Sequence, residues 1–169
     1  MQISQDELNQ FFDYDAESGN LIWKVHTNSH MKIGEVAGWE DPKEYRQISL
    51  LGKRYKAHRL IWIYHYGELN GILDHIDGDK HNNRIENLRL ATPSQNNCNT
   101  GLIKSNKSGL KGLYWDKINE KWRVQIEINR VRKNVGRFAD LFEAACVIIS
   151  LRNKLHGEFA NSGTKASLV

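Results

Sequence analysis

Short apolar runs separated by turn residues dominate the first 66 positions. Residues 11–24 (FFDYDAESGNLIWK) hold an apolar-aromatic run, a Gly-Asn turn and a second short run, which predicts a β-hairpin. Residues 45–51 (YRQISLL) and 53–60 (KRYKAHRL) flank Gly52 and alternate loosely, which predicts a second strand pair. Residues 58–66 (HRLIWIYHY) have apolar positions at helical spacing before Gly67, which predicts a short core helix.

Beyond residue 111 the pattern becomes strictly alternating. In residues 121–129 (KWRVQIEIN) apolar and polar side chains take turns, which predicts a strand with one buried face. The runs at 112–118 (GLYWDKI) and 133–139 (KNVGRFA) are close enough to complete a three-stranded antiparallel sheet. Asp140 and Glu143 have capping-box spacing ahead of an apolar stripe that ends at Gly157, so a helix is expected to follow the sheet.

The run at 99–111 (NTGLIKSNKSGLK) has the composition of a linker. We therefore predict an α+β chain, with a first domain at 1–100, a basic linker at 101–110, a second domain at 111–160 and a tail at 161–169. No stretch approaches the roughly 18 to 20 apolar residues of a membrane span, and the start is polar and acidic. With only Cys98 and Cys146, neither a disulfide framework nor a four-thiolate zinc site is possible, and the cytoplasm is the expected compartment.

Positive charge is concentrated near the end of the chain. The formal net charge is +4, and residues 101–169 alone contain thirteen Lys and Arg against six Asp and Glu. Such asymmetry suggests contact with a polyanion. A solvated basic face without a ligand is the alternative.

Candidate chemistry lies between Leu73 and Asn99 (LDHIDGDKHNNRIENLRLATPSQNNCN). A short strand is expected to end at Asp74 and His75, and the turn residues 77–79 follow. Thr92, Pro93 and Gln95 form the start signal of a helix, so Asn96 should lie near its first turn. A strand, a return and a helix would bring four side chains together, namely Asp74, His75, Asn87 and Asn96.

These side chains suit phosphodiester hydrolysis. Carboxylate and amide oxygens are ligands for Mg²⁺ or Mn²⁺ and leave positions open for water and phosphate. An imidazole near its ordinary pKa of about 6.5 can accept a proton from an attacking water. Plain Asx turns, or a loose calcium loop at 77–83, are the alternatives, and zinc is disfavoured because no His or Cys pair has finger spacing.

The run HRLIW…G…LDHIDGDKHNNRIENLRLATPSQNNCN at 58–99 resembles the HNH endonucleases of the phage homing type, which have a ββα-metal motif, and FDYDAESGNLIWK at 12–24 resembles their N-terminal part. The resemblance implies that Asp74 and Asn96 hold one Mg²⁺ or Mn²⁺ per active site and that His75 is the general base. Asn87 would orient the base or brace the loop. Asn96 replaces the family's final His, Asn99 is a further residue near the site, and Asn83 and Asn97 are interpreted as structural.

The segment at 108–161, with Tyr114-Trp115, Gly136-Arg137-Phe138 and His156-Gly157-Glu158-Phe159, is similar to the ethylene-response-factor type of DNA-binding domain. In that family a three-stranded sheet enters the major groove. The residues implied to contact DNA are Lys111, Tyr114, Lys121, Arg123, Gln125, Arg130, Arg132 and Arg137. Of these, Arg123 and Gln125 are the candidates for base contacts.

The leading hypothesis is a sequence-recognising endonuclease that hydrolyses double-stranded DNA to 5′-phosphate and 3′-hydroxyl ends. A monomer that nicks is the default, while a dimer could cut both strands. No organic cofactor and no membrane are expected, and the cell would be a bacterial host if the chain is phage-encoded. A non-cleaving DNA-binding regulator on a nuclease scaffold is the alternative, and a nuclease for RNA or for any DNA sequence is a third hypothesis.

Overall fold

The structure is a computed structural model that describes residues 3–26, 32–102 and 105–161. Residues 103–104 of the predicted linker and 162–169 of the predicted tail lie outside the described residues. By backbone contacts the chain divides into two compact units, unit 1 at residues 1–90 and unit 2 at 91–169.

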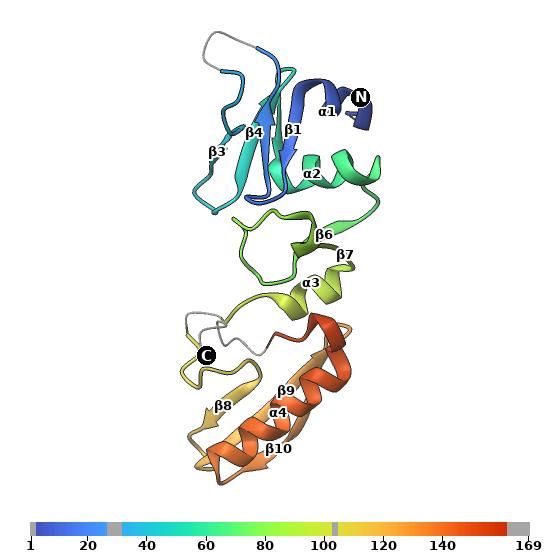
Figure 1. The fold of residues 1–169 in the computed structure, drawn as a ribbon. Helices are drawn as coiled ribbons and strands as arrows, with labels where there is room; N and C mark the ends of the chain where they lie inside the picture. Colours follow the sequence, from blue (N-terminus) through green and yellow to red (C-terminus); the bar gives the residue numbers. More distant parts are fainter. Residues whose placement is uncertain (1–2, 27–31, 103–104, 162–169) are drawn as a thin grey trace. The chain divides into compact units, whose positions relative to one another are not determined.

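Unit 1 begins with a helix that packs beside a hairpin (Figure 1). Its helices and strands are α1 (Gln5–Phe11), β1 (Phe12–Asp15), β2 (Asn20–Trp23), β3 (Trp39–Glu40), β4 (Arg46–Leu50), β5 (Lys53–Lys56), α2 (Ala57–Tyr66), β6 (Ile72–His75), the 3-10 turn η1 (Ile85–Asn87) and β7 (Leu88–Ala91). β1 pairs with β2, β3–β4–β5 form a three-stranded antiparallel sheet, and β6 lies beside β7. Gly67 ends α2 with a positive φ of 82°, as expected for a residue without a Cβ.

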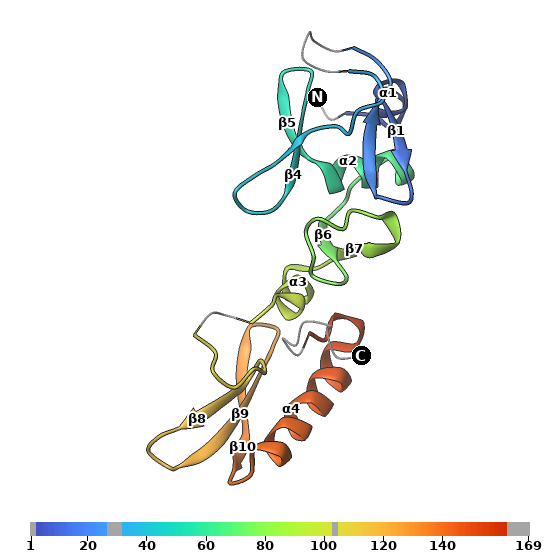
Figure 2. The ribbon, with the colours of Figure 1, turned by 60° about the vertical axis from the view of Figure 1, so that its left-hand side comes forward.

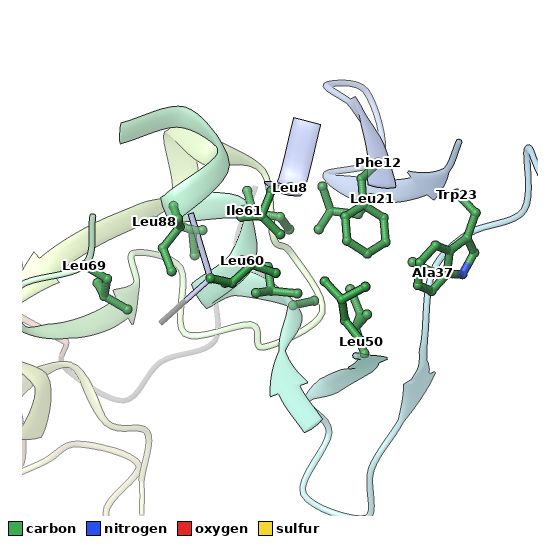
Figure 3. Close-up of a cluster of buried hydrophobic side chains, with 14 residues drawn as sticks. Leu8, Phe12, Leu21, Trp23, Ala37, Leu50, Leu60, Ile61, Leu69 and Leu88 are labelled. Carbon is green, nitrogen blue, oxygen red and sulfur yellow. The ribbon is translucent and has the colours of Figure 1, made fainter. Parts of the chain in front are cut away.

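A single hydrophobic core joins these elements (Figure 3). Leu8 of α1, Phe12 and Leu21 of the hairpin, and Leu60 and Ile61 of α2 are all fully buried in it. α2 thereby packs an apolar stripe into this core, and it also buries one polar residue, His58.

The β1–β2 hairpin also supports the loop that follows β6. The Tyr14 hydroxyl accepts a hydrogen bond from the Ile85 backbone N–H at 2.9 Å, and Arg84 Nε donates to the Glu17 carbonyl at 2.6 Å. Gly19, with a φ of 71°, lies so close to the backbone of residues 83 and 84 that a Cβ there would clash. The hairpin thus fixes one side of the loop that carries the candidate site.

Unit 2 has a helix on one face of a sheet (Figure 2). Its elements are α3 (Pro93–Asn99), β8 (Leu113–Asp116), β9 (Lys121–Ile128), β10 (Val131–Phe138), α4 (Leu141–His156) and the 3-10 turn η2 (Gly157–Phe159). The strands are antiparallel with β9 in the centre. Val124 and Ile126 of β9 are buried against Ala144 and Ile148 of α4, so the polar residues of β9 lie on the opposite face.

The mixture of helices and strands confirms the α+β class. The structure has the predicted strand at β9 and a helix that begins after Asp140, whose side chain accepts from the Glu143 N–H at 2.7 Å. The sequence did not predict α1, the two-residue strand β3 or the 3-10 turns η1 and η2. The contacts group α3 with unit 2, whereas the sequence placed it in the first domain; where the functional domains divide stays a prediction.

Candidate active site

Asp74 and His75 end strand β6, and both are buried. The Asp74 carboxylate is paired with Arg89 of the neighbouring strand β7, whose Nε and terminal nitrogen donate to Oδ2 at 3.0 and 2.9 Å. The two side chains are only 7% and 11% exposed. A buried carboxylate needs such a partner, because an unpaired charge in the interior is strongly unfavourable.

His75 is held by an asparagine that the sequence interpretation treated as structural. Asn83 Oδ1 lies 3.0 Å from His75 Nε2, and Asn83 is 2% exposed. An amide oxygen can only accept, so this contact favours the tautomer in which Nε2 carries the proton. Asn83 therefore selects the tautomer of the candidate base.

A second histidine lies at the edge of His75. The ring centroids of His58 and His75 are 5.1 Å apart and nearly perpendicular. Burial, followed by the charges of His75, Lys56 and Arg59, lowers the pKa of His58 to about 3. His58 is therefore neutral at physiological pH and adds no positive charge beside His75.

Asn87 braces the loop between the two strands. Its Oδ1 accepts from the Asp77 N–H at 3.1 Å, and its Nδ2 donates to Asp77 Oδ1 at 2.9 Å and to the Asn82 carbonyl at 2.8 Å. The sequence left two roles open for this residue. In the structure Asn87 makes the loop contacts, and Asn83 makes the contact to the base.

The Asp77-Gly78-Asp79 segment forms Asx turns. Asp77 accepts from the Asp79 N–H at 2.8 Å and from Asn82 Nδ2 at 2.7 Å, and Asp79 accepts from the His81 N–H at 3.0 Å. Burial opposes ionisation of Asp77, but these hydrogen bonds and those from Asn87 outweigh it and lower its pKa. The carboxylates of this turn thus stabilise the loop locally.

Asn96 lies on α3 in unit 2. Thr92 caps this helix reciprocally with Gln95, and Pro93 is its first residue, as the sequence predicts. The backbone N–H of Asn96 donates to the Thr92 carbonyl at 2.9 Å, which places Asn96 in the first turn. Its meeting with Asp74 stays a prediction.

Two cations of unit 2 bind the carboxyl end of α3. Lys111 Nζ donates to the carbonyls of Asn97, Cys98 and Thr100 at 3.3, 3.0 and 2.6 Å, and Arg152 donates to the Cys98 carbonyl at 3.0 Å. The last carbonyls of a helix lack partners within it, and positive charge there is favourable. Burial, followed by the charge of Arg152, lowers the pKa of Lys111 to about 8. With four acceptors in α3 and its C-cap, this ammonium has none of its three N–H groups left for a phosphate, so Lys111 is not among the proposed DNA contacts.

The other implied DNA contacts lie on β8–β10 and the adjoining turns. Strand pairing sets Tyr114 and Arg137 opposite Arg123, and Asn134 opposite Gln125. Two ion pairs flank this row, Arg137 with Asp116 at 2.9 Å and Arg132 with Glu127 at 3.2 Å. Hydrogen bonds from Arg137 and Asn119 hold the pKa of Asp116 well below its usual range. Lys121 is exposed at the start of β9, and Arg130 occupies the β9–β10 turn with a φ of 66°.

Comparison with known proteins identifies the first part of this arrangement. Residues 55–98 match the family model described as HNH endonuclease. Protein 3.8 of Escherichia phage T7 is 39% identical over 120 residues, which are 70% of this chain and 96% of that protein. The chain belongs to the family of Protein 3.8 and contains an HNH endonuclease domain.

The name of a second relative also contains the words HNH endonuclease. "Uncharacterized HNH endonuclease L560" of Acanthamoeba polyphaga mimivirus is 36% identical over 89 residues, 52% of this chain and 44% of that protein. No solved structure matches the chain significantly. The resemblance to HNH endonucleases is thereby confirmed, and the HNH domain indicates a nuclease.

HNH nucleases generally use a divalent metal ion. No cluster of three or more His, Cys, Asp or Glu in the described part of the chain could hold a metal ion. Asp74 fits such an ion chemically, because carboxylate oxygens are the hard ligands that Mg²⁺ and Mn²⁺ prefer and a carboxylate can accept from more than one partner. None of the described helices is long and apolar enough to cross a membrane.

Proposed function

We propose that this chain is a metal-dependent, sequence-recognising DNA endonuclease of the homing type. The observation that carries the proposal is the pairing of His75 Nε2 with Asn83 beside the Asp74–Arg89 ion pair, inside an HNH domain. A buried imidazole of fixed tautomer next to a buried carboxylate suits a general base beside a metal ligand.

In the proposed reaction His75 Nδ1 takes a proton from a water molecule as that water attacks phosphorus. The new bond joins the water oxygen to phosphorus, the bond to the 3′-oxygen breaks, and the 3′-oxygen gains a proton from solvent. The products are a 5′-phosphate and a 3′-hydroxyl. Asn83 keeps the lone pair of His75 on Nδ1, and Asn87 holds the loop on which Asn83 lies.

Asp74 and Asn96 would hold one Mg²⁺ or Mn²⁺. When bound, this ion supplies Lewis-acid stabilisation of the charge that develops on the phosphate and on the leaving oxygen. One carboxylate and one amide are hard oxygen donors and do not form a thiolate or imidazole site for zinc. Arg89 offsets the charge of Asp74 within the protein and keeps its carboxylate in place.

Recognition of the double-stranded target is assigned to unit 2. The outer face of β8–β10 presents Tyr114, Lys121, Arg123, Gln125, Arg132 and Arg137, and Arg130 adjoins it. Arg and Gln can read guanine and adenine through paired hydrogen bonds, so Arg123 and Gln125 are the proposed base readers. This is the arrangement implied by the resemblance to the ethylene-response-factor type of domain. The chain would act as a monomer that nicks, in the cytoplasm of a bacterial host.

The test is strand breakage by the purified chain. Supercoiled plasmid and host genomic DNA are incubated with Mg²⁺ or Mn²⁺, with EDTA as the control, and the breaks are mapped by sequencing. We expect breaks that require the metal, carry 5′-phosphates and recur at one sequence. Specific binding without breaks would instead favour a regulator built on a nuclease scaffold, and breaks at random positions would refute sequence recognition.

A further inference from the structure

Two lysines of unit 1 share one aromatic ring. Lys56 Nζ lies 3.7 Å from the ring centroid of Tyr45, and Lys80 Nζ lies 5.1 Å from it. Lys56 ends β5, Lys80 lies in the loop after β6, and Tyr45 immediately precedes β4. The ring is thus a platform on which chain segments distant in sequence place two ammonium groups.

The platform adjoins the candidate base. The Tyr45 centroid lies 6.4 Å from that of His75 and 5.5 Å from that of His58. Lys56 Nζ is therefore at most about 10 Å, and Lys80 Nζ at most about 11.5 Å, from the ring centroid of His75. Because successive phosphates of one strand advance about 3.4 Å along the helix axis, the platform is within about three nucleotides of a phosphate held at His75.

The charges around Tyr45 are not balanced. Burial, opposed by Asp41, lowers the pKa of Lys56, and Arg59, Lys43 and Lys80 lower it further. The carboxylate of Asp41 is engaged by the Lys43 and Tyr45 N–H groups and by Gln47. Glu44 reaches Lys80 at 3.4 Å, but its side chain is 69% exposed, so solvent screens this pair.

Lys80 is held in place by two acceptors of the segment that precedes β4. Its Nζ donates to the Lys43 carbonyl at 3.0 Å, while the exposed Glu44 carboxylate is a second, weaker partner. Both lysines are half-buried, so their stems are packed and only the amines need to meet a ligand. Two positioned ammoniums with an excess of positive charge suit a monoanionic phosphodiester.

We propose that Lys56 and Lys80, on the Tyr45 platform, bind one backbone phosphate of the DNA strand that is cut, within about three nucleotides of the broken bond. This inference rests on the proposed endonuclease function and extends it. The DNA contacts drawn from the resemblance all lie in unit 2, whereas this phosphate site would give the nuclease unit its own hold on the substrate.

The first experiment measures binding to a mixed-sequence duplex in EDTA as a function of salt. Lys56→Met and Lys80→Met keep the packed stems of the side chains and remove their charges. The double variant should flatten the slope of log K against log salt by about 0.9, the value for one phosphate. Lys24→Met is the matched control, since Lys24 is 41% exposed and Lys80 36%. The Lys56→Arg, Lys80→Arg variant should restore the slope. An unchanged slope in a folded Met variant overturns the site.

The second experiment locates the phosphate by ethylation interference on a fragment with a mapped break. One ethylated phosphate within about three nucleotides of the break should weaken binding of the natural chain and not of the double Met variant. If the double Met variant differs from the natural chain only at a phosphate farther from the break, the proposal is overturned. If the natural chain makes no breaks, the endonuclease function fails, while the salt slope still reports on the phosphate site.

Discussion

Replacement of Arg89 by Met should destabilise unit 1 strongly. Arg89 donates twice to Asp74 Oδ2, at 3.0 and 2.9 Å, and the two side chains are 11% and 7% exposed. Removal of one partner of a buried ion pair leaves the other charge uncompensated, at a cost of about 3 to 5 kcal/mol. A unit of this size loses about 4 to 8 °C in Tm per kcal/mol, so a fall of roughly 12 °C or more is expected.

The measurement is urea unfolding followed through amide resonances of Leu60 and Ile61, which lie in the core of unit 1. Arg59→Met, which removes an exposed arginine, is the control and should stay within about 0.5 kcal/mol of the natural chain. Combination of Arg89→Met with Asp74→Asn should recover about 0.5 to 3 kcal/mol, because no charge is then left buried. An Arg89→Met protein within about 1 kcal/mol of the natural chain would show that Arg89 does not compensate a buried charge on Asp74.

Three further predictions concern the groups around the site. Asn83→Leu removes the acceptor for the His75 N–H, so the cleavage rate should fall about 10- to 100-fold with DNA affinity unchanged. The ¹⁵N spectra of this variant should show mixed His75 tautomers, and a single tautomer would contradict the prediction. Because the unfolded state binds the His58 proton more readily, His58 alone should remove about 1.4 kcal/mol of unit 1's stability per pH unit as pH falls from 6.5 toward about 3. His58→Phe should reduce the slope in urea titrations by that amount. Lys111→Met should speed amide exchange at residues 97–100 and leave the salt slope of DNA binding unaltered, whereas a slope flatter by about 0.9 would place Lys111 on DNA.

Much of the fold is predictable because an element with one buried face shows a regular spacing of apolar residues in its sequence. Val124 and Ile126 face α4 while their neighbours face away, so the sequence of β9 alternates over its whole length. α1 was missed because only Leu8 of the helix is buried; its signal was the capping box of Ser4 and Glu7. β3 has two residues, which is too short for any periodicity to appear.

Some residues of the candidate site were predictable from the local sequence, and others depend on the tertiary fold. Asp74 and His75 are adjacent at the end of a strand, and Asn96 follows a strong capping signal, so their elements are local properties of the sequence. The contact of Asn83 with His75 depends on how the loop between them folds back, and no spacing rule distinguishes Asn83 from Asn82. Lys111 resembles any basic surface residue in the sequence, and only the tertiary fold directs its ammonium to the end of α3.

In the proposed reaction His75 is the general base of a metal-dependent nuclease. The most direct measurement compares nicking rates of supercoiled DNA in Mg²⁺ for the natural chain, His75→Ala and His81→Ala, with folding of each verified by its amide spectrum. His81 is an exposed histidine of the same loop and serves as the matched control. We expect a loss of at least about 100-fold in the nicking rate for His75→Ala alone. Equal rates for a folded His75→Ala protein and the natural chain would contradict it.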